Sequence, residues 1–140
     1  PSGICRSELM SIMNTNVAGV CIMTQAFLPL LAASTNDPKV VNISSLLGSI
    51  THANGINSTG YRCSKAALNM LTRGFAAEYP KITFLAVHPG WVQTDMGSAK
   101  NRIPPVPISE SAEGILNVAE SSLISNSGDF VSWKGDKIEF

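Results

Sequence analysis

Two continuous apolar runs constrain the fold of this chain more than any other feature of its sequence. Residues Lys39–Ser44 (KVVNIS) and Ile82–His88 (ITFLAVH) are short, and turn-forming residues bound them. Apolar runs of this length are typical of strands that are buried on both faces, and such strands belong to parallel sheets. A third, shorter strand is predicted at Asp129–Trp133.

Helical segments alternate with these strands. A long helix is predicted over residues 7–31, where apolar side chains cover nearly every face, and Pro29 is expected to bend or end it. Further helices are predicted at Tyr61–Tyr79 and over 109–122, the latter with Ser109 as its N-cap. This alternation predicts an α/β fold with helices on both faces of the sheet.

Three strands make a thin sheet for helices as apolar as these. We therefore expect the C-terminal part of a doubly wound parallel sheet whose first strands are missing. Residues 1–140 would form one partial domain. The chain begins at Pro1 rather than Met, which favours a processed or incomplete product.

Composition excludes several classes of function. The chain is 44% apolar, as expected of a globular protein, and its ten basic and ten acidic residues cancel, so no net field recruits nucleic acid. Cys5, Cys21 and Cys63 have no metal-like spacing, so we expect no metal site and a reducing, cytoplasmic compartment. The apolar run over 17–33 contains three polar or breaking residues, which favours a buried core helix over a membrane span.

Polar side chains follow the first two strands, at the sheet edge where such folds place their chemistry. Ser44 and Ser45 end the first strand, and Tyr61 and Lys65 lie one turn apart at the start of the next helix. An ammonium group there favours the ionised phenol, which can exchange a proton with a carbonyl or alcohol oxygen. A nearby serine hydroxyl can hold that oxygen.

Each of these features alone has an ordinary explanation. A Tyr–Lys pair can be a surface pair of a helix, and serines can satisfy loop backbone. Asn16, inside the long apolar helix, can be a satisfied core amide. Their combination changes the interpretation.

Four segments occur in the order and approximate spacing of one known family. They are Asn16–Gly19 (NVAG), Val41–Ser45 (VNISS), Tyr61–Ala67 (YRCSKAA) and His88–Met96 (HPGWVQTDM). Together they resemble the short-chain dehydrogenase/reductases, and their residues are most similar to those of the sniffer and C-factor-like carbonyl reductase branch. The resemblance covers nearly the whole chain and implies a Rossmann-like, NAD(P)-binding domain.

The resemblance implies a catalytic role for each matching residue. Tyr61 would be the general acid in carbonyl reduction, and Lys65 would favour its ionised form and hold the nicotinamide ribose. Ser45 would hydrogen-bond the substrate oxygen, with Ser44 as the alternative because the loop to Tyr61 is longer than in the shortest members. Asn16 would kink its helix and anchor a water that relays protons to Lys65.

The resemblance also implies a cofactor and partners. Pro89 and Gly90 would shape the wall beside the nicotinamide, and the Val92 backbone and the Thr94 hydroxyl would meet its carboxamide. NADP(H) is favoured over NAD(H), and the substrate would be a small carbonyl compound or alcohol. Asn16, Tyr61 and Lys65 complete the expected cofactor contacts. A homodimer or homotetramer would form through the helices at 7–31 and 61–79.

One departure from the family pattern matters. The family opens with a strand and a T-G-x-x-x-G-x-G turn that holds the pyrophosphate, and this sequence contains no such turn. The 140 residues alone are therefore expected to be inactive. A second hypothesis follows: a truncated, catalytically silent protein that acts through oligomer or partner contacts. A sugar-nucleotide epimerase shares the Tyr–Lys pair, but the segment after Thr94 is too compact for its substrate domain.

Overall fold

A single sheet of three parallel strands lies at the centre of the computed structural model, which describes residues 4–140. The strands are β1 (Lys39–Ile43), β2 (Thr83–His88) and β3 (Phe130–Ser132), adjacent in the order β1-β2-β3. Ile43 pairs with Val87, so β1 and β2 end at the same level of the sheet. The predicted three-stranded parallel sheet is confirmed.

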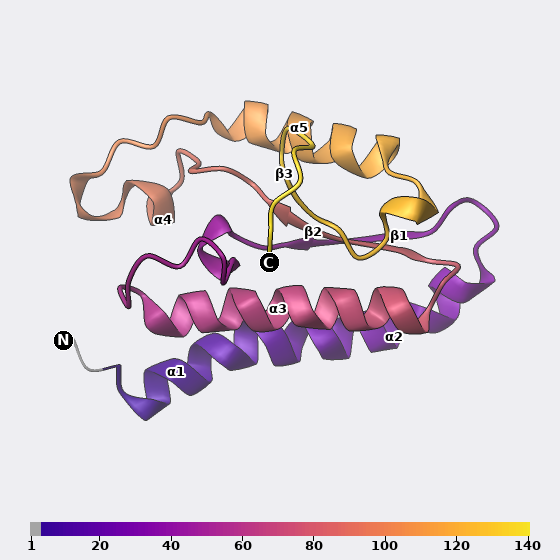
Figure 1. Ribbon diagram of the computed structural model, residues 1–140, viewed down its shortest axis with the longest axis horizontal. Helices are drawn as coiled ribbons and strands as arrows, with labels where there is room; N and C mark the ends of the chain where they lie inside the picture. Colours follow the sequence, from indigo (N-terminus) through magenta and orange to yellow (C-terminus); the bar gives the residue numbers. More distant parts are fainter. Residues whose placement is uncertain (1–3) are drawn as a thin grey trace.

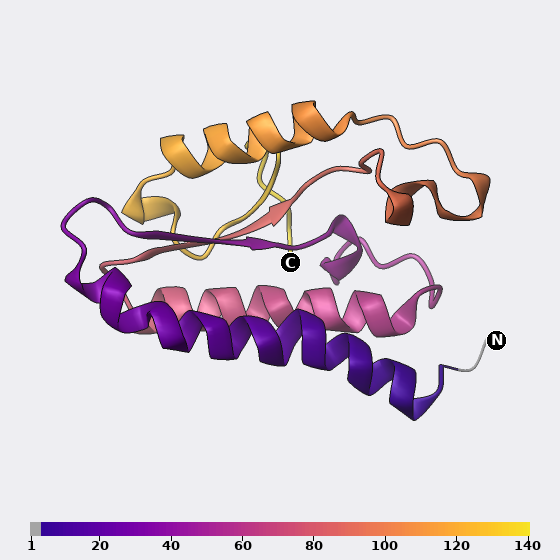
Figure 2. The ribbon, with the colours of Figure 1, turned by 180° about the vertical axis from the view of Figure 1, so that it is seen from behind.

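Helices cover both faces of this sheet (Figure 1). The long N-terminal helix and α3 lie on one face, and α5 lies on the other, an arrangement that is also clear from behind (Figure 2). The helical segments are α1 (Arg6–Met13), the π-helix η1 (Asn14–Gly19), α2 (Val20–Ala33), the 3-10 helix η2 (Leu46–Gly48), α3 (Thr59–Glu78), α4 (Asp95–Ser98), the 3-10 helix η3 (Ala99–Asn101), α5 (Ile108–Ser121) and the 3-10 helix η4 (Ile124–Asn126).

Three local predictions need correction. Pro29 does not end its helix, because α2 continues to Ala33. Proline has no N–H to donate to the carbonyl of Gln25, but both residues are exposed, so water can bond this carbonyl instead. Pro107, not Ser109, is the N-cap of α5. Residues 95–107, whose three prolines and lack of periodicity predict a loop, contain the short helices α4 and η3.

The core has one part on each side of β2. Leu85 and Val87 pack with Val118 of α5 and Val131 of β3. On the other side, Phe84 stacks on Phe75 of α3, with ring centroids 5.5 Å apart, and Ile82 joins this cluster. Alternate side chains of a strand point to opposite faces, so β2 supplies both parts and is the central strand of the sheet.

The helix from Arg6 to Ala33 is a continuous 28-residue segment that is long and apolar enough to cross a membrane by length and composition. We expected this helix to be buried in a core or against a partner. Within residues 4–140 it is not a buried core helix, and contact with a partner stays a prediction. Apolar side chains along it are exposed, Ile22 by 64% and Leu30 by 68%. Its outer face therefore needs a covering surface.

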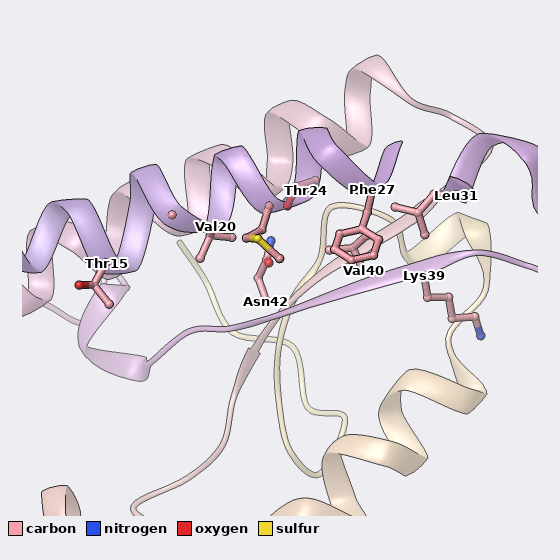
Figure 3. A pocket seen from close by; sticks show the side chains of 10 residues that line it. Thr15, Val20, Thr24, Phe27, Leu31, Lys39, Val40 and Asn42 are labelled. Atoms are coloured by element: carbon pink, nitrogen blue, oxygen red, sulfur yellow. The ribbon is translucent and has the colours of Figure 1, made fainter. Parts of the chain in front are cut away.

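An open hollow lies between α2 and the free edge of β1 (Figure 3), with a volume of about 660 Å³. Phe27 and Leu31 of α2 and Val40 and Asn42 of β1 are among the side chains that line it. Within residues 4–140, β1 pairs only with β2. This hollow thus lies beside the sheet edge, away from the carboxyl ends of the strands.

Candidate active site

Tyr61 and Lys65 lie on the first turns of α3, which begins at Thr59. They are four residues apart and share one face of the helix. The Lys65 Nζ atom lies 5.6 Å from the centroid of the Tyr61 ring and donates a 2.7 Å hydrogen bond to the main-chain oxygen of Ile43. The last residue of β1 is therefore joined directly to the Tyr–Lys pair.

Lys65 is 9% exposed, and burial lowers the pKa of its ammonium group from the ordinary value of 10.5. The hydrogen bond to Ile43 compensates part of the cost of burying the charge. Most lysines on a helix extend into water, and this one does not. The structure thus places a buried ammonium near the Tyr61 ring, and its effect on the phenol stays a prediction.

Ser44 and Ser45 differ clearly in their surroundings. The Ser44 side chain is 1% exposed and donates a 2.5 Å hydrogen bond to Oδ1 of Asn69 on α3. The Ser45 hydroxyl accepts a hydrogen bond from the N–H of Leu47 at 3.2 Å, which caps η2. The proton of Ser44 is committed to Asn69, whereas the proton of Ser45 remains available for a substrate oxygen.

Close packing holds the serine segment against α3. A Cβ atom added to Gly48 of η2 would lie 2.7 Å from both the Cβ and the main-chain carbon of Lys65, so only glycine fits at this position. The chain that follows Ser45 thus lies against the helix that carries Tyr61 and Lys65. Ser45 therefore lies at the sheet edge to which Lys65 is bonded through Ile43, and Tyr61 lies one helical turn before Lys65.

Asn16 lies inside the π-helical segment η1, where the helix was expected to kink. Its Nδ2 atom donates a 3.0 Å hydrogen bond to the Ser64 hydroxyl, which in turn donates to the main-chain oxygen of Tyr61 at 2.8 Å. Asn16 therefore reaches the residue next to Lys65 rather than Lys65 itself. Such π-helical turns are rare and often mark functional sites.

The segment with Pro89 and Gly90, which was expected to border the nicotinamide, begins where β2 ends. The Ser111 hydroxyl donates to the main-chain oxygen of Pro89 at 2.7 Å. Gly90 has a φ of 88°, and a Cβ there would lie 2.8 Å from Nε1 of Trp133, so this position also requires glycine. The wall beside the expected nicotinamide position therefore rests on α5 and on the residue after β3.

Val92 and Thr94 continue this wall. Val92 forms an isolated parallel bridge with Val106, and the Thr94 hydroxyl accepts a 3.1 Å hydrogen bond from the N–H of Gly97, which caps α4. The same hydroxyl donates a long hydrogen bond of 3.5 Å to the main-chain oxygen of Val92. Thr94 thus caps a short helical turn that the sequence did not predict, and contact of Val92 and Thr94 with a nicotinamide stays a prediction.

Sequence reasoning missed Asn69, Ser111 and Trp133 as supports of this site. Asn69 follows Tyr61 and Lys65 at the same spacing of four residues, and that spacing could have identified it. Ser111 and Trp133 reach the Pro89–Gly90 turn from distant parts of the chain. No local pattern indicates such contacts.

Comparison with known proteins agrees with this geometry. Residues 2–104 match the family model described as short chain dehydrogenase. The C-signal of Myxococcus xanthus is 31% identical over 134 residues, covering 94% of this chain and 78% of that protein. The short-chain dehydrogenase RED3 of Pyricularia oryzae is 36% identical, covering 89% of this chain and 53% of that protein.

Two solved structures share the fold over almost all of the chain. The carbonyl reductase Sniffer of D. melanogaster has a TM-score of 0.90 at 30% identity and is matched over 99% of this chain and 60% of its own. An NADPH-bound carbonyl reductase from chicken fatty liver has a TM-score of 0.87 at 36% identity, over 98% of this chain and 59% of its own. This chain thus spans little more than half the length of RED3 and of these two structures, and it belongs to the short chain dehydrogenase family.

Proposed function

We propose that the full-length protein is an NAD(P)(H)-dependent oxidoreductase that reduces a carbonyl compound or oxidises the corresponding alcohol. The observation that carries this proposal is the position of Lys65, whose buried ammonium lies 5.6 Å from the Tyr61 ring centroid and is bonded to the strand that leads to Ser45. A proton donor, its charged neighbour and a free hydroxyl at one edge are what carbonyl reduction needs.

In the direction of reduction, the nicotinamide supplies a hydride to the carbonyl carbon. The Tyr61 hydroxyl gives its proton to the carbonyl oxygen as the C=O double bond becomes a single bond, and the Lys65 ammonium stabilises the phenolate that results. The Ser45 hydroxyl donates a hydrogen bond to the same oxygen while negative charge develops on it. In the reverse direction the phenolate accepts the alcohol proton.

Asn16 takes part indirectly in this proposal. Its contact with Ser64 ties the π-helical turn to the α3 backbone beside Tyr61. A water held by this turn would return protons to Lys65 from solvent. The asparagine would therefore support repeated turnover rather than the hydride step itself.

The chain offers residues for one end of the cofactor. Lys65 would hold the nicotinamide ribose, and Pro89, Gly90, Val92 and Thr94 would form the wall for the ring. The fit is supported by Gly90, whose lack of a Cβ keeps the turn close against Trp133. NADP(H) is favoured over NAD(H), since solved structures similar to this chain contain bound NADPH or NADP.

Partner contacts and location belong to the same proposal. The exposed apolar face of the Arg6–Ala33 helix, together with α3, would form the interface of a homodimer or homotetramer. Met70 of α3 is 72% exposed, which adds apolar surface to that interface. The proposed location is the cytoplasm. There, a second copy of the protein, rather than a membrane or nucleic acid, would cover these helices.

The Tyr61→Phe substitution tests the proposed function in the full-length protein, with benzaldehyde and NADPH as probes. Loss of the proton donor should lower kcat by about a hundredfold or more. Tyr79→Phe is the matched control, because Tyr79 packs against Phe75 at the far end of the same helix. Equal turnover of the wild type and the Tyr61→Phe variant would refute the proposal.

A second candidate is a catalytically silent protein that acts through partner contacts. The observation that favours it is the exposed apolar face of the Arg6–Ala33 helix, along which Ile22 and Leu30 are exposed. The full-length sequence separates the two candidates. A T-G-x-x-x-G-x-G turn ahead of these residues favours the enzyme.

A further inference from the structure

Residues 137–140 lie against the loop that follows the predicted catalytic serine. The main-chain oxygen of Phe140 accepts two hydrogen bonds from Thr51, one from its N–H at 3.0 Å and one from its hydroxyl at 2.7 Å. The Ser49 hydroxyl donates to the main-chain oxygen of Glu139 at 2.6 Å. Glu139 and Phe140 therefore accept hydrogen bonds from Ser49 and Thr51, in the loop that follows Ser45.

The turn at 49–52 is a fully bonded unit. Ser49 is 2% exposed, its hydroxyl accepts from the N–H of His52 at 3.2 Å, and it lies 2.9 Å from Nδ1 of the same histidine. The Ser49 hydroxyl donates its single proton to Glu139, so it can only accept from His52. Nδ1 of His52 is therefore protonated and donates to the Ser49 hydroxyl. Each bonding position of this hydroxyl is used, and such a buried network holds one conformation.

The other end of the contact is fixed to the rest of the fold. The Phe140 ring lies 5.8 Å from the ring of Phe130 in β3, and the guanidinium of Arg73 on α3 lies 6.0 Å from its centroid. The N–H of Ile138 donates to the main-chain oxygen of Phe130 at 2.8 Å. The segment therefore connects β3 and α3 to the turn at 49–52.

We infer that residues 137–140 position the active site by holding the turn at 49–52 and, through it, the segment that carries Ser45. This inference rests on the proposed function. Between Ser45 and the turn lies η2, whose Gly48 packs directly against Lys65. A displaced turn would therefore move both the hydroxyl donor and the packing around the buried ammonium.

The same segment carries the apolar surface that a carbonyl substrate would contact. Leu46, Leu47 and Ile50 are exposed by 39%, 39% and 74%. Residues 89–94, which would hold the nicotinamide, belong to a different loop. Loosening the turn at 49–52 should therefore weaken binding of the carbonyl compound more than binding of the cofactor, which contacts this segment only through Lys65.

The experiment compares Phe140→Ala with Phe140→Trp in the full-length protein, using benzaldehyde and NADPH. The alanine variant should raise KM for benzaldehyde or lower kcat/KM by about tenfold or more, because small misplacements of reacting groups are costly. KM for NADPH should rise by a clearly smaller factor. The tryptophan variant keeps an aromatic ring against Phe130 and Arg73 and should restore most of the activity.

A structural control and a second readout complete the test. Ser127→Ala removes hydrogen bonds to Phe84 and Ile82 near the opposite end of β2, so it should lower stability without raising KM for benzaldehyde. Hydrogen–deuterium exchange reports on the contact without any activity. Amides of residues 47–53 should exchange at least about tenfold faster in Phe140→Ala, whereas those of α5 should not.

The outcomes separate the two claims. A wild type that does not reduce carbonyl compounds overturns the proposed function, while the exchange experiment still decides whether residues 137–140 hold the turn. Unchanged exchange at 47–53, or equal rises in KM for benzaldehyde and NADPH, overturns the positioning role. If Phe140→Ala does not fold, Thr51→Val, which removes only the hydroxyl bond to Phe140, is judged by the same two readouts.

Discussion

Ser44, which follows β1, and Asn69 of α3 are joined by a buried 2.5 Å hydrogen bond, with the serine hydroxyl as donor. Two residues earlier, Nδ2 of Asn42 on β1 donates to the Thr72 hydroxyl of the same helix at 2.9 Å. These two bonds fix the register between the strand that leads to Ser45 and the helix that carries the Tyr–Lys pair. The candidate active site thus lies beside a row of buried polar contacts.

The two adjacent serines should respond differently to substitution. Ser45→Ala should lower kcat by about tenfold or more while changing the free energy of unfolding little, because it removes a hydrogen bond to the reacting oxygen. Ser44→Ala should cost about 1–3 kcal/mol of stability, because Asn69 is left buried without its donor. Steady-state kinetics and urea unfolding of both variants measure the two effects.

The reverse pattern would exchange the two roles. If Ser44→Ala lost turnover at full stability and Ser45→Ala unfolded easily, Ser44 would be the substrate-binding serine. Asn69→Ala provides the control, since it removes the partner of Ser44 and should resemble Ser44→Ala.

The fold could be predicted because burial on both faces leaves a direct trace in the sequence. A strand such as Thr83–His88 must be apolar throughout when helices cover both of its sides. The spacing of Tyr61 and Lys65 likewise determines that they share a helical face. Local patterns of this kind specify strands, helices and the residues that a single helix brings together.

The rest depends on contacts that a local pattern does not contain. The apolar segment Arg6–Ala33 has the same composition whether it is buried in a core, covered by a partner or placed in a membrane, so its exposure could not be predicted. The contacts of Trp133 with Gly90 and of Phe140 with Thr51 join residues far apart in the chain. Only the folded structure shows them.

Lys65→Met should separate stability from activity. The substitution removes a buried charge and keeps an apolar stem of similar length, so the variant should be as stable as the wild type at pH 7, or more stable by about 1 kcal/mol. Turnover should fall by about a hundredfold, because the phenolate of Tyr61 loses its charged neighbour. Kinetics and denaturant unfolding at one pH test both halves.

The pH dependence gives a second check on Lys65. Burial lowers the pKa of this group in the folded state below its ordinary value of 10.5. At pH values between the lowered pKa and 10.5, the unfolded chain therefore binds more protons than the folded chain. The unfolding free energy of the wild type should therefore rise with pH in this window, relative to that of Lys65→Met. A constant difference between the two proteins from pH 7 to pH 10.5 would contradict the burial of the charged form.

Lys39→Met should destabilise the protein through α5. The Lys39 Nζ atom donates to three main-chain oxygens at the end of that helix: Ala119 at 2.9 Å, Glu120 at 3.1 Å and Ser122 at 2.7 Å. Cations at this end satisfy free carbonyls and oppose the helix dipole, so we expect a loss of about 1–3 kcal/mol.

Asp37→Asn is the matched control for Lys39. It removes only the 3.3 Å ion pair between Asp37 and Lys39. Because Asp37 is exposed, this pair should contribute no more than about 1 kcal/mol. Similar losses from both substitutions, measured by chemical unfolding, would show that the ion pair and not the helix end explains the effect of Lys39.

Two glycines, on helices that cover opposite faces of the sheet, should give opposite results when replaced by alanine. A Cβ at Gly114 of α5 would lie 2.4 Å from Cε3 of Trp133 and 2.5 Å from its main-chain oxygen, whereas a Cβ at Gly74 of α3 meets no atom within 4 Å. Gly114→Ala should cost about 1–3 kcal/mol through overpacking, and Gly74→Ala should stabilise the helix by up to about 1 kcal/mol. Because Trp133 also contacts Gly90, Gly114→Ala should in addition raise KM for NADPH, while Gly74→Ala leaves it unchanged. Thermal melts measure the stability of both variants, and titrations with NADPH measure their cofactor binding. If Gly114→Ala were as stable as the wild type and bound NADPH equally well, Trp133 would be free to move. It would then not support the wall formed by residues 89–94.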